Sequence, residues 1–409
     1  MATHRPSTTP NGSTTDCQAN GSTNGVLTSN GHTNHAGSAE ACSKEGVETE
    51  GDTRKAALSE AAQEALTEHN LPHTLPSLGE IKRALPSHVF ESRVSTSVYY
   101  VVKDVAQVVG LFLLADWLWS SCVLPTWVLA VLVPGYWLLQ GTLFWALFVL
   151  GHDAGHGSFS RSPLLNDAVG NALHGFVLCP YYCWKLSHRQ HHAFTGNMDK
   201  DEVFYPVRSK QDRQNKFIPV FGFGVSWFSY LFTGYQPRPV NHFNPSEPMF
   251  ARHMLACTLS ITLVICWTVG LWHYALTAGM TKLLLHFAVP EFIFASYLVL
   301  TTFLHHTDEH VPWYDDSLWD FVRGQLSSVD RHYGWCHDIV HNIGTHQIHH
   351  LFTTIPHYHL EEATRAFRSK FPHLVRKRDE SILPAFHRIF FKWIKQRVVP
   401  DSTLVHVYT

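Results

Sequence analysis

The sequence predicts an all-α integral membrane protein, with four transmembrane helices in two hairpins, interfacial helices and a cytosolic helical domain. Three observations predict this fold: two long apolar blocks, basic residues gathered on one side of those blocks, and histidine clusters that follow them. Each block is too long for one span of about 20 residues. A turn residue divides each block, which indicates a pair of antiparallel helices.

The four spans follow from the positions of the turn residues. Pro125 divides the first block, and Gly279 divides the second. The predicted spans are residues 105–123, 127–150, 254–276 and 283–304. Two shorter apolar stretches, residues 168–184 and 217–232, are too short to span with certainty. They are predicted either as interfacial helices or as buried helices of the cytosolic domain.

Basic residues predict the topology. The turn at residues 120–126 contains no lysine or arginine, and the loop before the fourth span contains only Lys282. The segments before the first span, between the hairpins and after the fourth span contain many. The positive-inside rule therefore places both termini and the middle segment in the cytosol.

The domain organisation follows from composition. Residues 1–70 are rich in Ser, Thr, Asn and Gly, and we expect a disordered polar tail there. Residues 71–390 form the predicted membrane domain, and residues 391–409 a C-terminal tail. The net charge of -2 excludes a strongly basic nucleic-acid binder, so no nucleic-acid partner is expected.

Histidine is the unusual residue, with 30 copies against 31 for lysine and arginine together. Neutral imidazole is the commonest metal ligand among side chains, so clustering decides what this excess means. The clusters read HDAGH at 152–156, HRQHH at 188–192 and HQIHH at 346–350. Residues at i, i+3 and i+4 share a helical face, so each cluster can present its imidazoles together. The candidate ligands are His152, His156, His188, His191, His192, His346, His349 and His350.

A ninth candidate, His306, lies at the cytosolic end of the fourth span. His305, His310 and His341 are weaker candidates. Nine imidazoles exceed the four ligands of one tetrahedral metal and suit two metal ions. Imidazole binds iron, zinc, copper and nickel alike, so ligand type alone leaves the metal open.

Two other classes of protein fit this site less well. A histidine-rich metal transporter needs ligands at mid-membrane depth, whereas these clusters follow the spans. A zinc-dependent membrane hydrolase needs three protein ligands and a carboxylate base, which nine histidines argue against.

With these motifs in place, the chain resembles the membrane fatty-acyl desaturases, specifically the methyl-end acyl-lipid group (Δ12 and ω-3). The three histidine boxes stand in the order of that family, and HDAGHGSFSRSPLLND, SHRQHHAFTGNMDKDEVFYP, DRHYGW and THQIHHLFTTIPHYHLEEAT resemble family segments. The resemblance covers roughly residues 70–390. Thr302 stands at the offset from His306 where the acyl-CoA branch has a supporting asparagine, so that role stays open.

The resemblance implies an O2-dependent oxidoreductase whose cytosolic domain carries a di-iron site. The eight box histidines and His306 would hold two iron ions. The HxxxH spacing of the first box favours an acyl-lipid substrate, such as a phospholipid-bound 18-carbon chain. The motifs favour an ω-3 (Δ15) desaturase. The alternatives are a Δ12 enzyme that converts oleate to linoleate, a bifunctional enzyme, and a divergent hydroxylase, acetylenase or epoxygenase.

Electrons must come from a separate protein, because no HPGG motif of a fused cytochrome b5 is present. The resemblance implies cytochrome b5 and its reductase at the endoplasmic reticulum membrane. Ferredoxin would replace them in a plastid membrane, the alternative compartment that the acid-poor start of the chain leaves open. The basic stretch 208–216 is either a docking site for an acidic donor or a solvated loop.

Several further residues are predicted to support the site. Second-sphere groups orient metal-bound imidazoles, and the candidates for that role are Asp153, Asp201, Asp330 and Asn342. Trp184 and Phe194 are candidates to line an acyl channel. Asp116, His286 and Glu291 are ionisable residues in or near the spans, where such groups are functional suspects.

Overall fold

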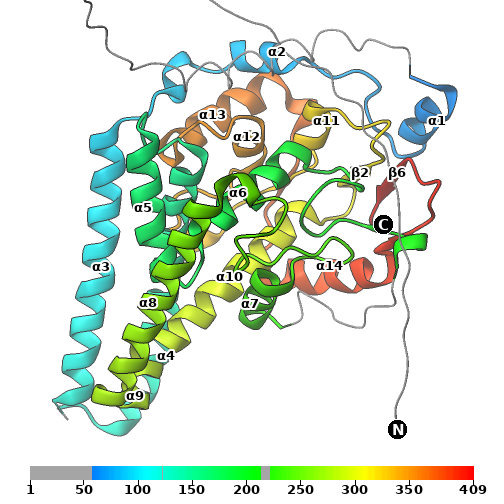
Figure 1. Cartoon of the computed structure of the whole chain (residues 1–409). Helices are drawn as coiled ribbons and strands as arrows, with labels where there is room; N and C mark the ends of the chain where they lie inside the picture. The colour runs from blue at the N-terminus through cyan, green and yellow to red at the C-terminus, as the bar shows by residue number, and fades with distance from the viewer. Residues whose placement is uncertain (1–57, 122, 213–221) are drawn as a thin grey trace, which may run out of the picture. The chain divides into compact units, whose positions relative to one another are not determined.

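The computed structural model describes residues 58–121, 123–212 and 222–409 of the chain. Residues 1–57, which make up most of the predicted polar tail, lie outside the described residues. The described part is mainly helical, with three two-stranded sheets of short strands. Figure 1 shows the long helices running alongside one another, with the shorter elements gathered at one end of them.

Four helical stretches are long and apolar enough to cross a membrane, as predicted. They are α3 (Val94–Ser120), α4 (Thr126–His156), α8 (Met254–Ala278) and the run Met280–His306, which comprises α9 (Met280–Leu283), the π-helix η4 (Leu284–Ala288) and α10 (Val289–His306). Pro125 caps α4, and Gly279 adopts a φ of 94° between α8 and α9, so both predicted turns are confirmed. Glycine is favoured there because its missing Cβ permits positive φ.

The first helix begins at Val94, earlier than the predicted residue 105. The added turns bury Ser97 and Asp104. These turns extend the helix beyond the N-terminal end of the apolar block, so hydropathy alone did not reveal them.

Helix α4 is the centre of the bundle. It packs against α3, α5 (Pro163–Phe176) and α10, and every residue from Gln140 to Ala154 is buried. Since α4 ends at His156 and α10 ends at His306, these two helices carry their histidines to the same end of the bundle, called here the site end.

The first short apolar stretch is divided between two helices. A bend at residues 177–180 separates α5 from α6 (Tyr181–Phe194), which carries the second histidine box. Gly170 lies directly against the Tyr181 ring, where a Cβ would clash. The second stretch becomes α7 (Gly224–Thr233), which packs against α10.

The predicted N-terminal tail is wrong over its last part. Helix α1 (Glu60–Glu68) begins after Ser59, whose hydroxyl accepts the Ala62 N–H. Ala62 and Leu66 are buried in a cluster with Leu318 and Val405. The partners of this helix lie more than 200 residues away in the sequence, so local composition did not reveal it.

The predicted C-terminal tail is also wrong. Helix α14 (Ile382–Gln396) runs through the predicted boundary, and Trp393 is buried. After it, β5 (Val398–Val399) pairs in parallel with β1 (Val207–Arg208), and β6 (Val405–Val407) pairs antiparallel with β2 (Pro312–Tyr314). The last residues therefore belong to the folded domain.

The remaining elements surround the site end. They are α2 (Leu78–Arg83), η1 (Ser87–Phe90), η2 (Ser209–Gln211), η3 (Ala251–His253), α11 (Phe321–Gln325), β3 (Asp330–Arg331), η5 (Gly334–Cys336), α12 (His346–Leu351), α13 (His357–Lys370), η6 (Pro372–Leu374) and β4 (Lys377–Arg378). β3 and β4 pair in parallel. Ile81, Ile348 and Phe367 share a core that fixes α12 against α2 and α13.

Candidate metal centre

The nine predicted histidines lie in two neighbouring clusters. The first cluster contains five of them: His152 and His156 from α4, His188 and His192 from α6, and His349 from α12. One ring nitrogen of each lies within 4.8 Å of those of the others. The Nε2 atoms of His152 and His156 are 3.2 Å apart, and those of His188 and His192 are 3.1 Å apart.

The second cluster contains the other four. His306 of α10 is central, with its Nε2 atom 3.2 Å from that of His191 and 3.1 Å from that of His346. The Nε2 atoms of His346 and His350 are 2.9 Å apart. All four side chains are buried, so this cluster is better shielded from water than the first, where His156 and His188 are half-buried.

The HxxHH spacing divides its imidazoles between the two clusters. On α6, the i and i+4 residues His188 and His192 join the first cluster, while His191 at i+3 joins the second. On α12 the assignment is reversed, because His349 at i+3 joins the first cluster. The imidazoles that the sequence places on one helical face are therefore divided between two neighbouring clusters.

The donor set fits two metal ions. Two nitrogens at about 2.0–2.1 Å from one metal and at a right angle would lie about 3 Å apart, close to the separations observed here. Burial, followed by the neighbouring imidazoles, lowers the pKa of His188, His346 and His349 well below its ordinary value. Neutral imidazoles keep the lone pair that binds a metal.

Polar partners fix two of these rings. The Nδ1 atom of His191 lies 2.7 Å from Oδ1 of Asp201, one of the four candidates for orienting the imidazoles. The Nδ1 atom of His350 lies 3.1 Å from both Gln325 Oε1 and Thr195 Oγ1. The Gln325 amide also donates to the His192 carbonyl, at 2.7 Å, and so connects the second and third boxes.

Gln325 and Thr195 were missed by sequence reasoning. A glutamine and a threonine are common surface residues, and only their complete burial in the fold marks them as partners of the site. Thr195 follows the HRQHH box by three residues, and its hydroxyl donates to the His191 carbonyl at 2.7 Å. A threonine three residues after a histidine box was therefore a local signal that the sequence contained.

The other predicted supporting residues have different outcomes. Asp153 accepts hydrogen bonds from the His357 backbone N–H and lies 2.9 Å from its Nδ1, so it fastens α13 to α4. Asp330 accepts the Gln347 N–H at 2.8 Å and so holds the third box by its backbone. The Oδ1 atom of Asn342 has no hydrogen-bond partner within the described ranges.

The three weaker histidine candidates lie outside both clusters. His305 has both ring nitrogens engaged, by the Val329 carbonyl and the Tyr333 hydroxyl. His341 places Nε2 at 2.6 Å from Asp104 of α3, and His310 is exposed. Neighbours in sequence thus have separate roles, since His306 joins a cluster and His305 does not.

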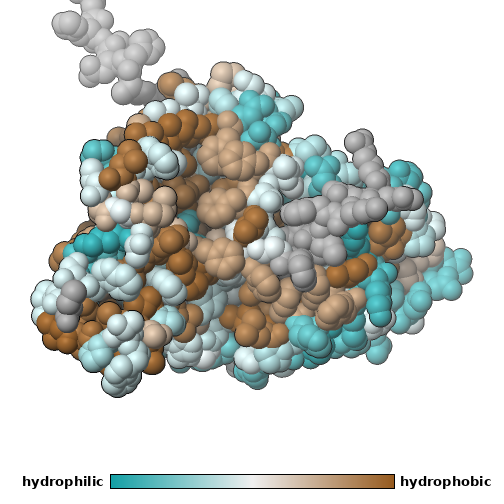
Figure 2. Space-filling model, turned by 90° about the horizontal axis from the view of Figure 1, so that it is seen from below, coloured by the Kyte–Doolittle hydropathy of each residue, from teal (hydrophilic) through white to brown (hydrophobic). Residues whose placement is uncertain are grey.

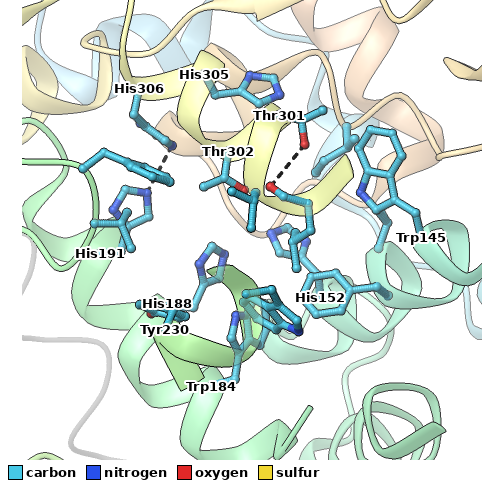
Figure 3. A pocket seen from close by; sticks show the side chains of 18 of the residues that line it. Trp145, His152, Trp184, His188, His191, Tyr230, Thr301, Thr302, His305 and His306 are labelled. Carbon is cyan, nitrogen blue, oxygen red and sulfur yellow. Dashed lines mark hydrogen bonds between the residues drawn. The ribbon is translucent and has the colours of Figure 1, made fainter. Parts of the chain in front are cut away.

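An apolar cavity ends on the clusters. Trp145, Phe148, Trp184 and Trp227 form much of its wall. The cavity reaches both clusters, because its polar wall includes five of the nine histidines: His152, His188, His191, His306 and His346. Figure 3 shows labelled aromatic and imidazole groups around the same space, among them Trp145, Trp184, His152 and His188, with Thr302 nearby.

One of the two residues predicted to line an acyl channel lies in the cavity wall, and the other does not. Trp184 lies in its wall, as predicted. Phe194 does not, because its ring packs on Trp319 with the centroids 5.7 Å apart. Phe194 is the last residue of α6.

The ionisable groups of the spans lie away from the clusters. Asp116 of α3 forms an ion pair of 2.6 Å with Lys282 of α9, next to the Gly279 turn. His286 lies 2.7 Å from the Tyr274 hydroxyl. Glu291 is buried, and neither of its carboxylate oxygens has a partner in the part of the chain that is described.

Replacing Asp201 with asparagine is expected to weaken metal binding at the second cluster by about 10–100-fold, because a carboxylate behind an imidazole raises its basicity and fixes its ring. Metal content after dialysis against graded chelator would measure this. Asp316→Asn is the control, because Asp316 is half-exposed and pairs with Lys200 at 2.7 Å. Equal metal retention in the two variants would show that Asp201 does not support the cluster.

A membrane bundle whose helices end in two imidazole clusters beside an apolar cavity defines a class of membrane proteins with a histidine-rich metal site. Comparison with known proteins agrees with this class: residues 125–380 match the family model described as fatty acid desaturase. The chain belongs to the fatty acid desaturase family.

Curated relatives extend over most of the chain. It is 39% identical over 334 residues to the sn-1 acyl-lipid omega-3 desaturase (ferredoxin) of Synechocystis, which covers 78% of this chain and 88% of the relative. It is 39% identical over 307 residues to the endoplasmic reticulum acyl-lipid omega-3 desaturase (cytochrome b5) of Arabidopsis thaliana, covering 71% and 75%. A chloroplastic omega-3 fatty acid desaturase of Glycine max is 40% identical over 332 residues, covering 76% and 69%.

Proposed function

We propose that this protein is an acyl-lipid desaturase that introduces a cis double bond at the ω-3 (Δ15) position of an unsaturated 18-carbon chain. The observation that carries the proposal is the apolar cavity whose wall includes imidazoles of both clusters. An acyl chain is the substrate that such a cavity suits, because apolar walls bind methylenes and a few polar groups mark the reacting end. The names of the relatives support the ω-3 position.

The two clusters would hold two iron ions. The five imidazoles of the first cluster and the four of the second would be the ligands, with Asp201 and Gln325 fixing the rings of His191 and His350. Bound iron would supply the O2-dependent oxidation that removes two hydrogens from adjacent methylenes, with two electrons delivered from outside.

The protein's own groups bind and position the chain. The rings of Trp184 and Phe148 contact each other at the cavity wall, with centroids 5.1 Å apart. Such rigid aromatic walls hold a chain in one path and exclude water from the reacting carbons. The distance along that path from the clusters to the closed end would set which carbons are oxidised.

The electron donor is proposed to be a separate cytochrome b5 with its reductase, at the cytosolic face of the endoplasmic reticulum membrane. Ferredoxin in a plastid membrane is the alternative, and relatives carry names with either donor. Arg208 is unsuited to docking, because it is buried and pairs with Asp199 and Asp315. Lys210 is exposed, and residues 213–216 lie outside the described residues.

The test is the fatty-acid profile of yeast that expresses the chain and is fed linoleate. New α-linolenate is expected. It should be absent with His191→Ala, because His191 belongs to the second cluster and also lines the cavity. The measurement is gas chromatography of fatty-acid methyl esters, with membrane-protein content compared by immunoblot.

Other products would identify the alternatives. New linoleate from endogenous oleate would mean a Δ12 enzyme, and both products together would mean a bifunctional one. Hydroxy, epoxy or acetylenic products would indicate a divergent member of the family. No new acyl product from a folded protein that contains two irons would contradict the proposed desaturase activity on these substrates.

A further inference from the structure

A third group of possible metal ligands lies outside the two histidine clusters. It consists of His88 from η1 and of His359 and Glu362 from α13, and is called here the outer site. One ligand atom of each of these side chains lies within 4.8 Å of those of the other two. None of the three belongs to the nine predicted histidine ligands, and the proposed desaturation does not use them.

The ligands of the outer site converge from two distant parts of the chain. His359 and Glu362 are three residues apart on α13 and therefore share one face of that helix. His88 is 274 residues from Glu362 in the sequence, yet its Nε2 atom lies 2.9 Å from Glu362 Oε2. The rings of His88 and His359 meet edge to face, with centroids 5.6 Å apart. Two ligands of one metal ion lie about 3 Å apart, so the observed separation suits a shared ion.

The backbone on both sides of the outer site is held in place by the protein core. The residue that follows each ligand is buried in one shared hydrophobic cluster, and these residues are Val89, Leu360 and Ala363. The Arg93 backbone N–H also donates to the Tyr358 hydroxyl at 2.7 Å, which fixes the segment after η1 against the start of α13. Ligands that the fold has already positioned lose less conformational entropy when they bind an ion.

Two imidazoles and one carboxylate form a donor set that suits zinc. Zinc binds imidazole nitrogen and carboxylate oxygen at about 2.0–2.2 Å, and three protein ligands leave a fourth position for water. Calcium and magnesium prefer oxygen donors, so two imidazoles do not suit them. The side chains of His88 and Glu362 are 49% and 42% exposed, so a hydrated ion can reach them. An exposed ion pair between these two residues stabilises a fold only weakly and needs no second imidazole.

The outer site lies away from the apolar end of the bundle. Figure 1 shows α13 at the opposite end of the molecule from α9. The view from below in Figure 2 looks onto the α9 end and shows hydrophobic side chains spread over that side. Along the chain, His88 precedes the first spanning helix and α13 follows the last one. The outer site is therefore accessible to ions from the aqueous phase.

We propose that the outer site binds one structural zinc ion through Nε2 of His88, a ring nitrogen of His359 and the carboxylate of Glu362. The ion joins η1 to α13 across the segment that leads into the first spanning helix. Nδ1 of His357, also on α13, lies 2.9 Å from Oδ2 of Asp153 on α4. The zinc thus braces the helix that is fastened to α4, which carries the first histidine box.

The test counts the metal ions in full-length, iron-loaded protein. After incubation with zinc chloride and removal of free ions, plasma emission spectrometry should find two irons and one zinc in each wild-type chain. His88→Ala and His359→Ala should keep the two irons and lose the zinc, because two remaining ligands bind zinc weakly. His373→Ala is the matched control and should retain the zinc, since His373 is exposed and belongs to none of the three groups.

A second readout needs no substitution. Carbethoxylation of histidines by diethyl pyrocarbonate, mapped by mass spectrometry, should fall at His88 and His359 when zinc is added and stay unchanged at His373. A wild-type chain without a third ion, zinc retained in His88→Ala, or unprotected His88 would overturn the inference. Loss of iron in step with zinc uptake would also overturn it, because the zinc would then occupy the two clusters. Neither readout depends on desaturation, so the outer site and the proposed function can fail separately.

Discussion

His306→Ala is expected to abolish desaturation and to lower iron from two ions per chain to about one, because the second cluster would lose its central ligand. The Nε2 atom of His306 lies close to those of His191 and His346, at 3.2 and 3.1 Å. The second cluster would then keep three imidazoles and lose the ligand that α10 supplies. Iron by plasma emission spectrometry and α-linolenate by gas chromatography measure the two effects.

The chain offers a control four residues away. His310 is exposed and outside both clusters, so His310→Ala should retain both irons and the product. His305→Gln is a stricter comparison, since His305 is buried beside His346 but has both nitrogens engaged elsewhere. Two retained irons in His306→Ala, or loss of one iron in His305→Gln, would contradict the ligand assignment.

Asp308→Asn is expected to destabilise the protein by about 3–5 kcal/mol, since removing one partner of a buried ion pair leaves an uncompensated charge. Asp308 is fully buried and forms ion pairs with Arg331 and Arg388. Arg331 also donates from Nε to the Leu304 carbonyl, at 3.1 Å, so the charge that would be left unpaired lies next to the end of α10. Thermal unfolding of the purified protein, followed by intrinsic tryptophan fluorescence, measures the change.

Two further variants, a control and a compensating double substitution, test the cause of this destabilisation. Asp338→Asn removes an exposed carboxylate and should leave the unfolding midpoint unchanged. Adding Arg331→Met to Asp308→Asn should recover part of the loss, because it removes the unpaired buried cation. An unchanged midpoint in Asp308→Asn alone would mean that water or Glu380 compensates the arginines.

Much of the membrane fold followed from the sequence because its signals are local. Apolar length, Pro125 and Gly279 predicted four spans, and the HxxHH spacing predicted that each cluster presents its imidazoles on one helical face. Those faces turned out to be divided between two clusters, which requires the relative rotation of helices distant in the chain. No periodicity within one segment contains that information.

The features that sequence reasoning missed depend on distant partners. Helix α1 is stabilised by Leu318 and Val405, and β6 by β2, so neither end of the domain could be placed from its own residues. His357 was not identified as a partner of Asp153 for the same reason, as 204 residues separate them. A lone His or Gln becomes informative only when the fold buries it beside a charged or metal-binding group.

Each cluster combines imidazoles from helices that precede the second membrane hairpin with imidazoles from α12, which follows it, and the second cluster adds His306 from the hairpin itself. During synthesis, α4 and α6 emerge first, and they hold five of the nine histidines without completing either cluster. Both clusters close only when α12 has left the ribosome and folded back onto them. Complete binding of two metal ions would therefore have to follow the folding of α12 onto the bundle.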